Sequence, residues 1–144
     1  MVASATGTHT ATVWDVEKGK VVFELELEHS NSVCAFSEND GLIFTGSLDG
    51  TVKVWDASTG KEISLLKGQT GFVLKCVPSQ SGNALLTCSD DKTAKLWDLS
   101  TGKVIHTLQH NGFYVSDGCL TSDEKTAITV GRFGLYIWDL KTGE

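Results

Sequence analysis

The dipeptide Trp-Asp occurs four times in this chain of 144 residues, at nearly constant intervals. The repeats begin at Trp14, Trp55, Trp97 and Trp138, which are separated by 41, 42 and 41 residues and are the only tryptophans in the chain. Segments 47–68 and 89–110, which surround the two middle copies, are identical at 12 of 22 positions. A period of this length indicates a fold that is built from repeated supersecondary units.

Within each period the residues alternate in the manner of antiparallel strands. The segment FELELE at residues 23–28 alternates Phe or Leu with Glu, which places apolar side chains on one face and carboxylates on the other. A glycine follows each Trp-Asp after three intervening residues, and Gly supplies the positive φ that closes a short hairpin. Further turn signals, such as residues 48–50 and 80–83, give three hairpins per period and therefore four short strands. The pattern predicts an all-β chain.

These repeats resemble the WD-repeat family of β-propellers, whose blades are four-stranded antiparallel sheets arranged around a central channel. The resemblance covers the whole chain and implies a partial propeller of about 3.5 blades. In each blade, strands a to d run outward from the centre, and Trp-Asp ends strand c. The expected strand order is b-c-d, a-b-c-d, a-b-c-d and a-b-c. We expect a partial blade at residues 1–27, full repeats at 28–67 and 68–109, and a last repeat at 110–144 that lacks strand d.

Several polar residues recur with the fold period. A His, an Asp and a hydroxyl in one repeat would suggest a nucleophilic triad, but catalysis requires a group that is unique to one repeat. The resemblance implies instead a structural tetrad, in which hydrogen bonds join His of the d–a loop, Thr of strand b, Asp of the b–c turn and Trp of strand c. The residues at these positions are His29, Thr45, Asp49 and Trp55 in the second unit, and Thr87, Asp91 and Trp97 in the third.

The tetrad pattern is incomplete in the other positions. Gln69 stands where the third unit would have His, and His110 takes the His position of the last unit. Counting back from the tryptophans places Ser4 and Thr8 at the Thr and Asp positions of the first unit, and Ile128 and Arg132 at those of the last. We expect these departures to weaken a blade without abolishing it, because most of the burial in a blade is apolar.

Composition excludes several classes of partner. The chain has 12 Lys+Arg against 18 Asp+Glu, a net charge of −6 and no run of four basic residues, so we expect neither a nucleic-acid nor a membrane partner. We find no apolar stretch of membrane-spanning length and no secretory signal. The four cysteines are dispersed, with no C-x-x-C pair. We therefore expect reduced thiols, no metal, no cofactor and a cytoplasmic protein, with a nuclear location left open.

No catalytic motif is found, and the sequence predicts a non-enzymatic scaffold for protein–protein interactions. By resemblance, the d–a and b–c loops form the face that binds a protein or peptide partner. Aromatic and Arg residues dominate binding hot spots, and the candidates on this face are Phe72, Phe113, Tyr114, Arg132 and Phe133. For Phe72 and Phe113 we favour packing between blades instead.

The pair Arg132-Phe133 lies between Gly131 and Gly134, which leave the backbone permissive. Arg can grip a carboxylate or phosphate with two parallel hydrogen bonds, so this turn suits an acidic partner peptide. The structural alternative is that Arg132 pairs with a local carboxylate such as Asp117.

Two broader questions stay open at this level. The chain could be a sensor or autoinhibitory propeller segment of a larger multidomain signalling or ubiquitin-ligase protein. Its open blades could be completed by further repeats of a longer chain, which we favour, or by two copies that join head to tail into an eight-bladed ring. An enzyme built on the propeller would need a cluster of ionisable groups that occurs in one repeat only, and the sequence offers none.

Overall fold

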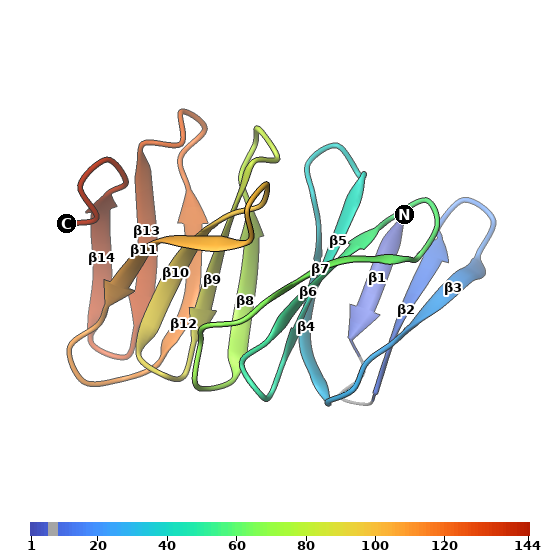
Figure 1. The fold of residues 1–144 in the computed structure, drawn as a ribbon, viewed down its shortest axis with the longest axis horizontal. Helices are drawn as coiled ribbons and strands as arrows, with labels where there is room; N and C mark the ends of the chain where they lie inside the picture. The colour runs from blue at the N-terminus through green and yellow to red at the C-terminus, as the bar shows by residue number, and fades with distance from the viewer. Residues whose placement is uncertain (6–8) are drawn as a thin grey trace.

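The structure of the chain is a computed structural model that describes residues 1–5 and 9–144, so Thr8 of the first unit lies outside the described residues. Every regular element in these two ranges is a β-strand, and the fourteen strands form four antiparallel sheets. The sheets stand side by side in chain order, with the first at the right of Figure 1 and the last at the left. The predicted all-β fold of consecutive blades is confirmed.

Each sheet is a meander in which strands that follow one another along the chain are paired. The first sheet contains β1 (Val2–Ala5), β2 (Thr10–Asp15) and β3 (Lys20–Glu26). The second contains β4 (Asn31–Phe36), β5 (Leu42–Ser47), β6 (Val52–Asp56) and β7 (Glu62–Leu66). The third contains β8 (Val73–Pro78), β9 (Ala84–Ser89), β10 (Thr93–Asp98) and β11 (Lys103–Gln109). The fourth contains β12 (Val115–Leu120), β13 (Thr126–Gly131) and β14 (Gly134–Asp139). The outer sheets thus have three strands and the middle sheets four, which is the expected strand order.

The apolar core lies in layers between neighbouring sheets. Trp55, Trp97 and Trp138 each pack toward the sheet that precedes their own. Trp97 of the third sheet, for example, shares a cluster with Val52 and Val54 of the second. Trp97 is 1% exposed and Trp55 is 5% exposed, whereas Trp14, with no preceding sheet among the described residues, is 40% exposed. The tryptophan of the repeat therefore joins one blade to the previous one.

The aspartate of Trp-Asp shapes the hairpin that follows strand c. In the second sheet, Asp56 Oδ1 accepts hydrogen bonds from the backbone N–H groups of Ser58 and Thr59 at 2.9 and 2.8 Å, and from their hydroxyls at 2.6 and 3.0 Å. The side-chain bond from Ser58, followed by that from Thr59, lowers the pKa of Asp56 to about 2. Gly60 closes the turn with a φ of +67°. Asp98 makes the same contacts with the backbone and hydroxyl of its own turn serine.

The described residues contain no helix that is long and apolar enough to cross a lipid bilayer.

Candidate functional site

A buried pair of tetrad residues, Trp and Thr, is joined by a hydrogen bond in both the second and the third unit. Trp55 Nε1 donates a hydrogen bond to Thr45 Oγ1 at 2.9 Å, and Trp97 Nε1 donates one to Thr87 Oγ1 at 2.8 Å. Both threonines lie on the strand next to their tryptophan and are at most 1% exposed. An indole N–H can only donate, so a buried tryptophan needs an acceptor of this kind.

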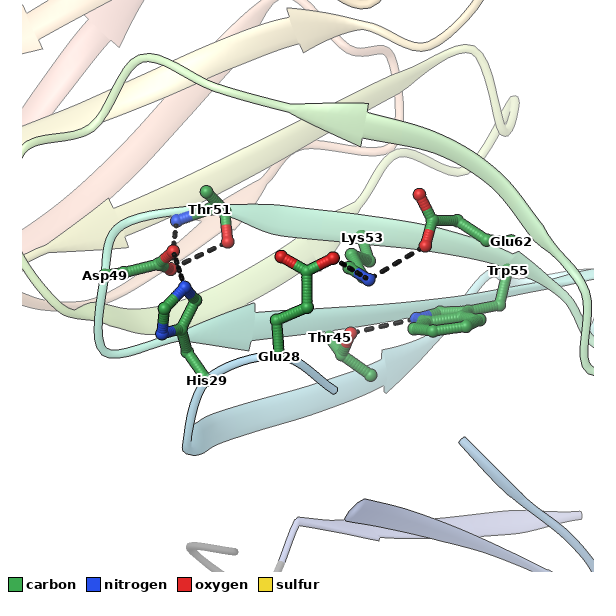
Figure 2. Close-up of polar contacts among 8 residues, drawn as sticks. All are labelled: Glu28, His29, Thr45, Asp49, Thr51, Lys53, Trp55 and Glu62. Atoms are coloured by element: carbon green, nitrogen blue, oxygen red, sulfur yellow. Dashed lines mark hydrogen bonds and ion pairs between the residues drawn. The ribbon is translucent and has the colours of Figure 1, made fainter. Parts of the chain in front are cut away.

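The other two members of the second unit's tetrad form a separate pair. His29 Nε2 lies 3.3 Å from Asp49 Oδ2. Asp49 Oδ1 accepts hydrogen bonds from the N–H of Thr51 at 3.0 Å and from its hydroxyl at 2.7 Å. Figure 2 shows these residues side by side. Burial favours the neutral form of Asp49, but the Thr51 bonds and the charge of His29 outweigh it and lower its pKa. The side chain of His29 is 56% exposed. Among the described residues no hydrogen bond joins this pair to Thr45.

A lysine that the sequence reasoning missed lies between the two pairs in the view of Figure 2. Lys53 Nζ is 2.9 Å from Glu62 Oε2 and 3.9 Å from Glu28 Oε1, and it lies 5.4 Å from the centre of the Trp55 ring. Its side chain is only 13% exposed. The tetrad expected as one connected set is therefore divided into two pairs, with an ion-pair cluster between them. The strand alternation at residues 52–54 could have indicated this position, because it places Lys53 on the opposite face of the strand from Val52 and Val54.

In the third unit, Asp91 connects two loops. Asp91 Oδ2 accepts a hydrogen bond of 2.8 Å from the N–H of Thr70 in the d–a loop, and its Oδ1 accepts two from Thr93. Gln69, which replaces His, is 6% exposed, and its Nε2 lies 3.5 Å from the carbonyl oxygen of Thr93. Gln69 Oε1 is buried and has no hydrogen-bond partner among the described residues. Neither Asp91 nor Gln69 contacts the Thr87–Trp97 pair through a described hydrogen bond.

The last unit corrects the prediction that Ile128 and Arg132 replace Thr and Asp. The threonine is present as Thr129, whose Oγ1 accepts a hydrogen bond from Trp138 Nε1 at 2.7 Å and lies 2.7 Å from His110 Nε2. The count from tryptophan failed because the b–c turn is one residue shorter here: Gly131 pairs directly with Gly134 across a two-residue loop. Aligning the strand TAITVG with LIFTGS and ALLTCS from its first residue would have found Thr129.

His110 forms the floor beneath this shortened turn. It is 3% exposed, and burial lowers its pKa. Its ring centre lies 4.2 Å from that of Tyr136 and 5.8 Å from that of Trp138. The fourth sheet therefore contains a connected Trp–Thr–His chain of hydrogen bonds.

Three of the five partner-binding candidates contact one another close to His110. The Arg132 guanidinium carbon lies 5.0 Å from the centre of the Phe113 ring and 5.8 Å from that of Phe133. The two phenylalanine rings are in edge-to-face contact, with centres 4.8 Å apart. We call these residues, Phe113, Arg132 and Phe133, the Arg132 cluster. A small hollow beneath it is lined in part by His110, Asn111 and Tyr136.

The cluster is exposed to solvent. Phe133 is 71% exposed and Phe113 is 37% exposed. Tyr114 follows Phe113 in the chain and is 43% exposed, whereas Phe72, 46% exposed, lies in the preceding d–a loop and contributes its carbonyl to a hydrogen bond from Asp90 N–H at 3.1 Å. Phe72 and Phe113 are thus both partly exposed, and the ring contact of Phe113 is with Phe133 of its own unit.

Arg132 does not form an ion pair with Asp117, which was the alternative to a role in partner binding. Asp117 Oδ1 is instead 3.2 Å from Lys75 Nζ. Among the described residues no carboxylate lies within ion-pair distance of Arg132. The guanidinium is thus placed by aromatic contacts alone.

The part of the chain that the structure describes offers no grouping of three or more His, Cys, Asp or Glu side chains that could hold a metal ion. Two of its cysteines are also poor nucleophiles. Burial raises the pKa of the Cys76 thiol far above its usual range, and burial together with the charge of Asp117 raises that of Cys88 to about 12. Both thiols therefore stay protonated at neutral pH.

Comparison with known proteins relates the repeats to a family. Residues 19–56 and 60–98, more than half of the chain, match the family described as WD domain, G-beta repeat. Autophagy-related protein 16 of Arabidopsis thaliana is 30% identical over 149 residues, which cover 99% of this chain and 29% of that protein. THO complex subunit 6 of Arabidopsis thaliana is 37% identical over 70 residues, covering 47% of this chain and 19% of that protein.

A third relative, the probable E3 ubiquitin ligase complex SCF subunit sconB of Trichophyton verrucosum, is 47% identical over 38 residues, 26% of this chain and 6% of that protein. The chain spans less than a third of the length of each of these three curated relatives. The match to a repeat family agrees with the four consecutive sheets of the structure and with the tryptophans that pack between them. The chain belongs to the WD40 repeat family and forms part of a propeller domain of the kind that serves protein interactions.

Proposed function

We propose that the chain is a non-enzymatic scaffold that binds a protein or peptide partner through its d–a and b–c loops. The observation that carries this proposal is the Arg132 cluster, in which a cation and two aromatic rings are exposed yet held in contact with one another. Trp, Tyr and Arg side chains supply much of the energy of protein interfaces. Contiguous exposed patches of large apolar side chains are typical of interaction surfaces.

The polar residues elsewhere support a structural role rather than catalysis. The Trp–Thr pair recurs at Thr45, Thr87 and Thr129, so it follows the fold period. An enzyme site would require a group found in one repeat only, placed in an accessible cleft. We place His29, Asp49 and Asp91 in the same structural class because their contacts are with turn and loop groups of the blades.

We further propose that the repeat units are residues 1–27, 28–67, 68–109 and 110–144, and that additional blades cover both outer sheets. Leu135 and Ile137 of β14 are 58% and 67% exposed, although they stand three residues and one residue before Trp138, as the buried Val52 and Val54 stand before Trp55. Further repeats of a longer chain, or a second copy, would bury these faces. Light scattering coupled to size-exclusion chromatography separates the two, since only the second requires a dimer of this chain.

Site-specific photo-crosslinking tests the proposed interface. A photoreactive phenylalanine analogue in place of Phe133 should crosslink the chain to its bound protein or peptide partner. The crosslinks should be saturable, and an excess of unlabelled chain should suppress them. The matched control carries the analogue in place of Gln80, an exposed residue of the a–b turn at the opposite end of the strands. Equal crosslinking at both positions would contradict the assignment of the binding face.

A second candidate function is that of a propeller segment within a larger signalling or ubiquitin-ligase protein. Only the match to the sconB subunit favours it, and that match covers 26% of this chain. A ubiquitin-ligase or nucleotide-binding module encoded next to this segment would support it. For either function we propose an intracellular location, cytoplasmic or nuclear.

A further inference from the structure

We infer that the Arg132 cluster recognises an acidic peptide segment, in which an Asp or Glu carboxylate meets Arg132 and a neighbouring apolar side chain packs on Phe133. This inference rests on the proposed interaction function and names the class of partner.

Arg132 is held in place while its hydrogen-bonding groups stay available. Its guanidinium lies 5.0 Å from the centre of the Phe113 ring, within the range of a cation–π contact. A guanidinium is planar and carries five N–H donors in a fixed fork that matches a carboxylate. Among the described residues Arg132 has neither an ion pair nor a hydrogen bond. Its N–H donors can therefore bind a partner without first breaking a hydrogen bond within the chain.

The residues beneath the arginine are closely packed. Gly131 pairs directly with Gly134, so the loop between them consists of Arg132 and Phe133 alone. A Cβ at Gly131 would lie 2.9 Å from His110 Nδ1, so the backbone here packs directly on the imidazole. His110 is in turn fixed by its contact of 2.7 Å with Thr129 and by the ring of Tyr136. A site that is already ordered loses less entropy when a ligand binds.

Local charge favours a carboxylate as the ligand. Arg132 is the chain's sole arginine, in a protein of net charge −6. The carboxylate that sequence reasoning placed beside it, Asp117, is already paired with Lys75. A single unpaired guanidinium matches one negative charge, whereas a phosphate group of about −1.5 to −2 is best satisfied by several cations. No lysine lines the hollow of the cluster.

The aromatic part of the cluster adds an apolar requirement. Phe133 is 71% exposed, and Tyr114 next to Phe113 is 43% exposed. The hollow below the rings is small, so a partner would lie across the cluster rather than insert a side chain into it. A leucine or similar residue beside the acidic one would cover Phe133 while the carboxylate reaches Arg132.

The test measures binding of the full chain to fluorescein-labelled synthetic peptides by fluorescence anisotropy. Three nine-residue pools share Leu at the positions flanking the centre, and their central residue is Asp or Glu, Asn or Gln, or phosphoserine. We expect the carboxylate pool to bind at least about tenfold more tightly than the amide pool, as a charge-assisted bidentate contact implies. Added salt should reduce this preference.

Variants locate the effect. Arg132→Ala should abolish the carboxylate preference, and Arg132→Lys should restore only part of it, because an ammonium lacks the planar fork. Lys125→Ala is the matched control, since it removes an exposed positive charge from an a–b turn at the other end of the strands. Near-UV circular dichroism of each variant should match the parent.

Several results would overturn the inference: equal binding of the carboxylate and amide pools, equal effects of the Arg132 and Lys125 variants, or much tighter binding of the phosphoserine pool. Crosslinking at Phe133 without a carboxylate preference would leave the interaction function standing and remove the acidic ligand. Loss of both crosslinking and peptide binding would remove both.

Discussion

Replacing Trp97 with alanine is expected to lower the free energy of unfolding by about 3–5 kcal/mol, the usual range for an aromatic-to-alanine change in a core. Trp97 is 1% exposed, and it packs in the layer between the second and third sheets with Phe44, Val54 and Leu66. The change therefore removes contacts within the third blade and its attachment to the second.

A second substitution separates packing from hydrogen bonding. Trp97→Phe keeps an aromatic ring but leaves Thr87 Oγ1, which is 0% exposed, without its indole donor at 2.8 Å. The Thr87 hydroxyl keeps its hydrogen bond of 3.4 Å to the Lys95 carbonyl oxygen. We expect this variant to lose about 1–3 kcal/mol from the lost indole hydrogen bond. The difference between the alanine and phenylalanine variants then measures the packing contribution of a phenyl-sized ring at this position.

Trp14→Ala provides the matched control, because Trp14 occupies the same place in the Trp-Asp repeat but is 40% exposed. Its loss should be below about 2 kcal/mol, since a partly exposed side chain gains less from burial. Urea unfolding followed by far-UV circular dichroism measures all three variants, with a common m-value as the check on two-state behaviour. A loss under about 1 kcal/mol for Trp97→Ala, or one no larger than that of Trp14→Ala, would refute the assignment of Trp97 as an inter-blade anchor.

Three further predictions concern the polar framework. Thr129→Val should lose about 1–3 kcal/mol, and a double-mutant cycle with Trp138→Phe should be clearly non-additive, whereas simple additivity would contradict the shared hydrogen bond. Because burial lowers the pKa of His110, the unfolded chain binds this proton more tightly, so stability should fall as the pH drops through 6.5, the ordinary value. His110→Gln should flatten that part of the pH profile of the urea midpoint, and an unchanged slope would argue against a buried neutral imidazole. NMR titration of the Asp56 carboxyl should give a midpoint near 2, and Ser58→Ala should move it toward 3.8 unless the serine bond is unimportant.

The sheet framework was predictable from the sequence because its determinants are local and repeated. Strand alternation, the turn glycine and the Trp-Asp period all act within a few residues, and together they specify strand order and chain direction. The buried Trp55–Thr45 and Trp97–Thr87 pairs were predictable for the same reason, since a turn of equal length separates the two residues in both units.

Two of the misplaced residues, Thr129 and His29, are explained by the length of a loop. Thr129 was missed because the b–c turn lost one residue between it and Trp138, so a count from the tryptophan fell on Ile128. His29 follows a short d–a connection and reaches Asp49 at the surface instead of the buried threonine. A count along the sequence cannot locate a side chain across a turn whose length changes.

The Arg132 cluster belongs to a different class, because it brings together two loops that are separated by the whole of β12 and β13. The d–a loop supplies Phe113 and the b–c turn supplies Arg132 and Phe133. Sequence reasoning placed all three on one face, but their mutual contacts depend on side-chain directions at two adjacent turns. These directions follow from the short hairpin and from the packing of Gly131 on His110.

The four units differ in a way that separates framework from binding surface. The Trp–Thr pair is the same in the second, third and fourth units, but its surroundings change. The second unit has the Lys53–Glu62 ion pair near Trp55, the third has a buried glutamine, and the last has a histidine in contact with the threonine. The last unit retains a connected buried chain of hydrogen bonds while its b–c turn has lost the aspartate that ties the corresponding turn of the third unit to a neighbouring loop. Freed from that contact, the turn carries an arginine and a phenylalanine into solvent. Changes to the Trp–Thr pairs should therefore act on stability, whereas changes to Arg132 should act on partner binding and leave stability nearly unchanged.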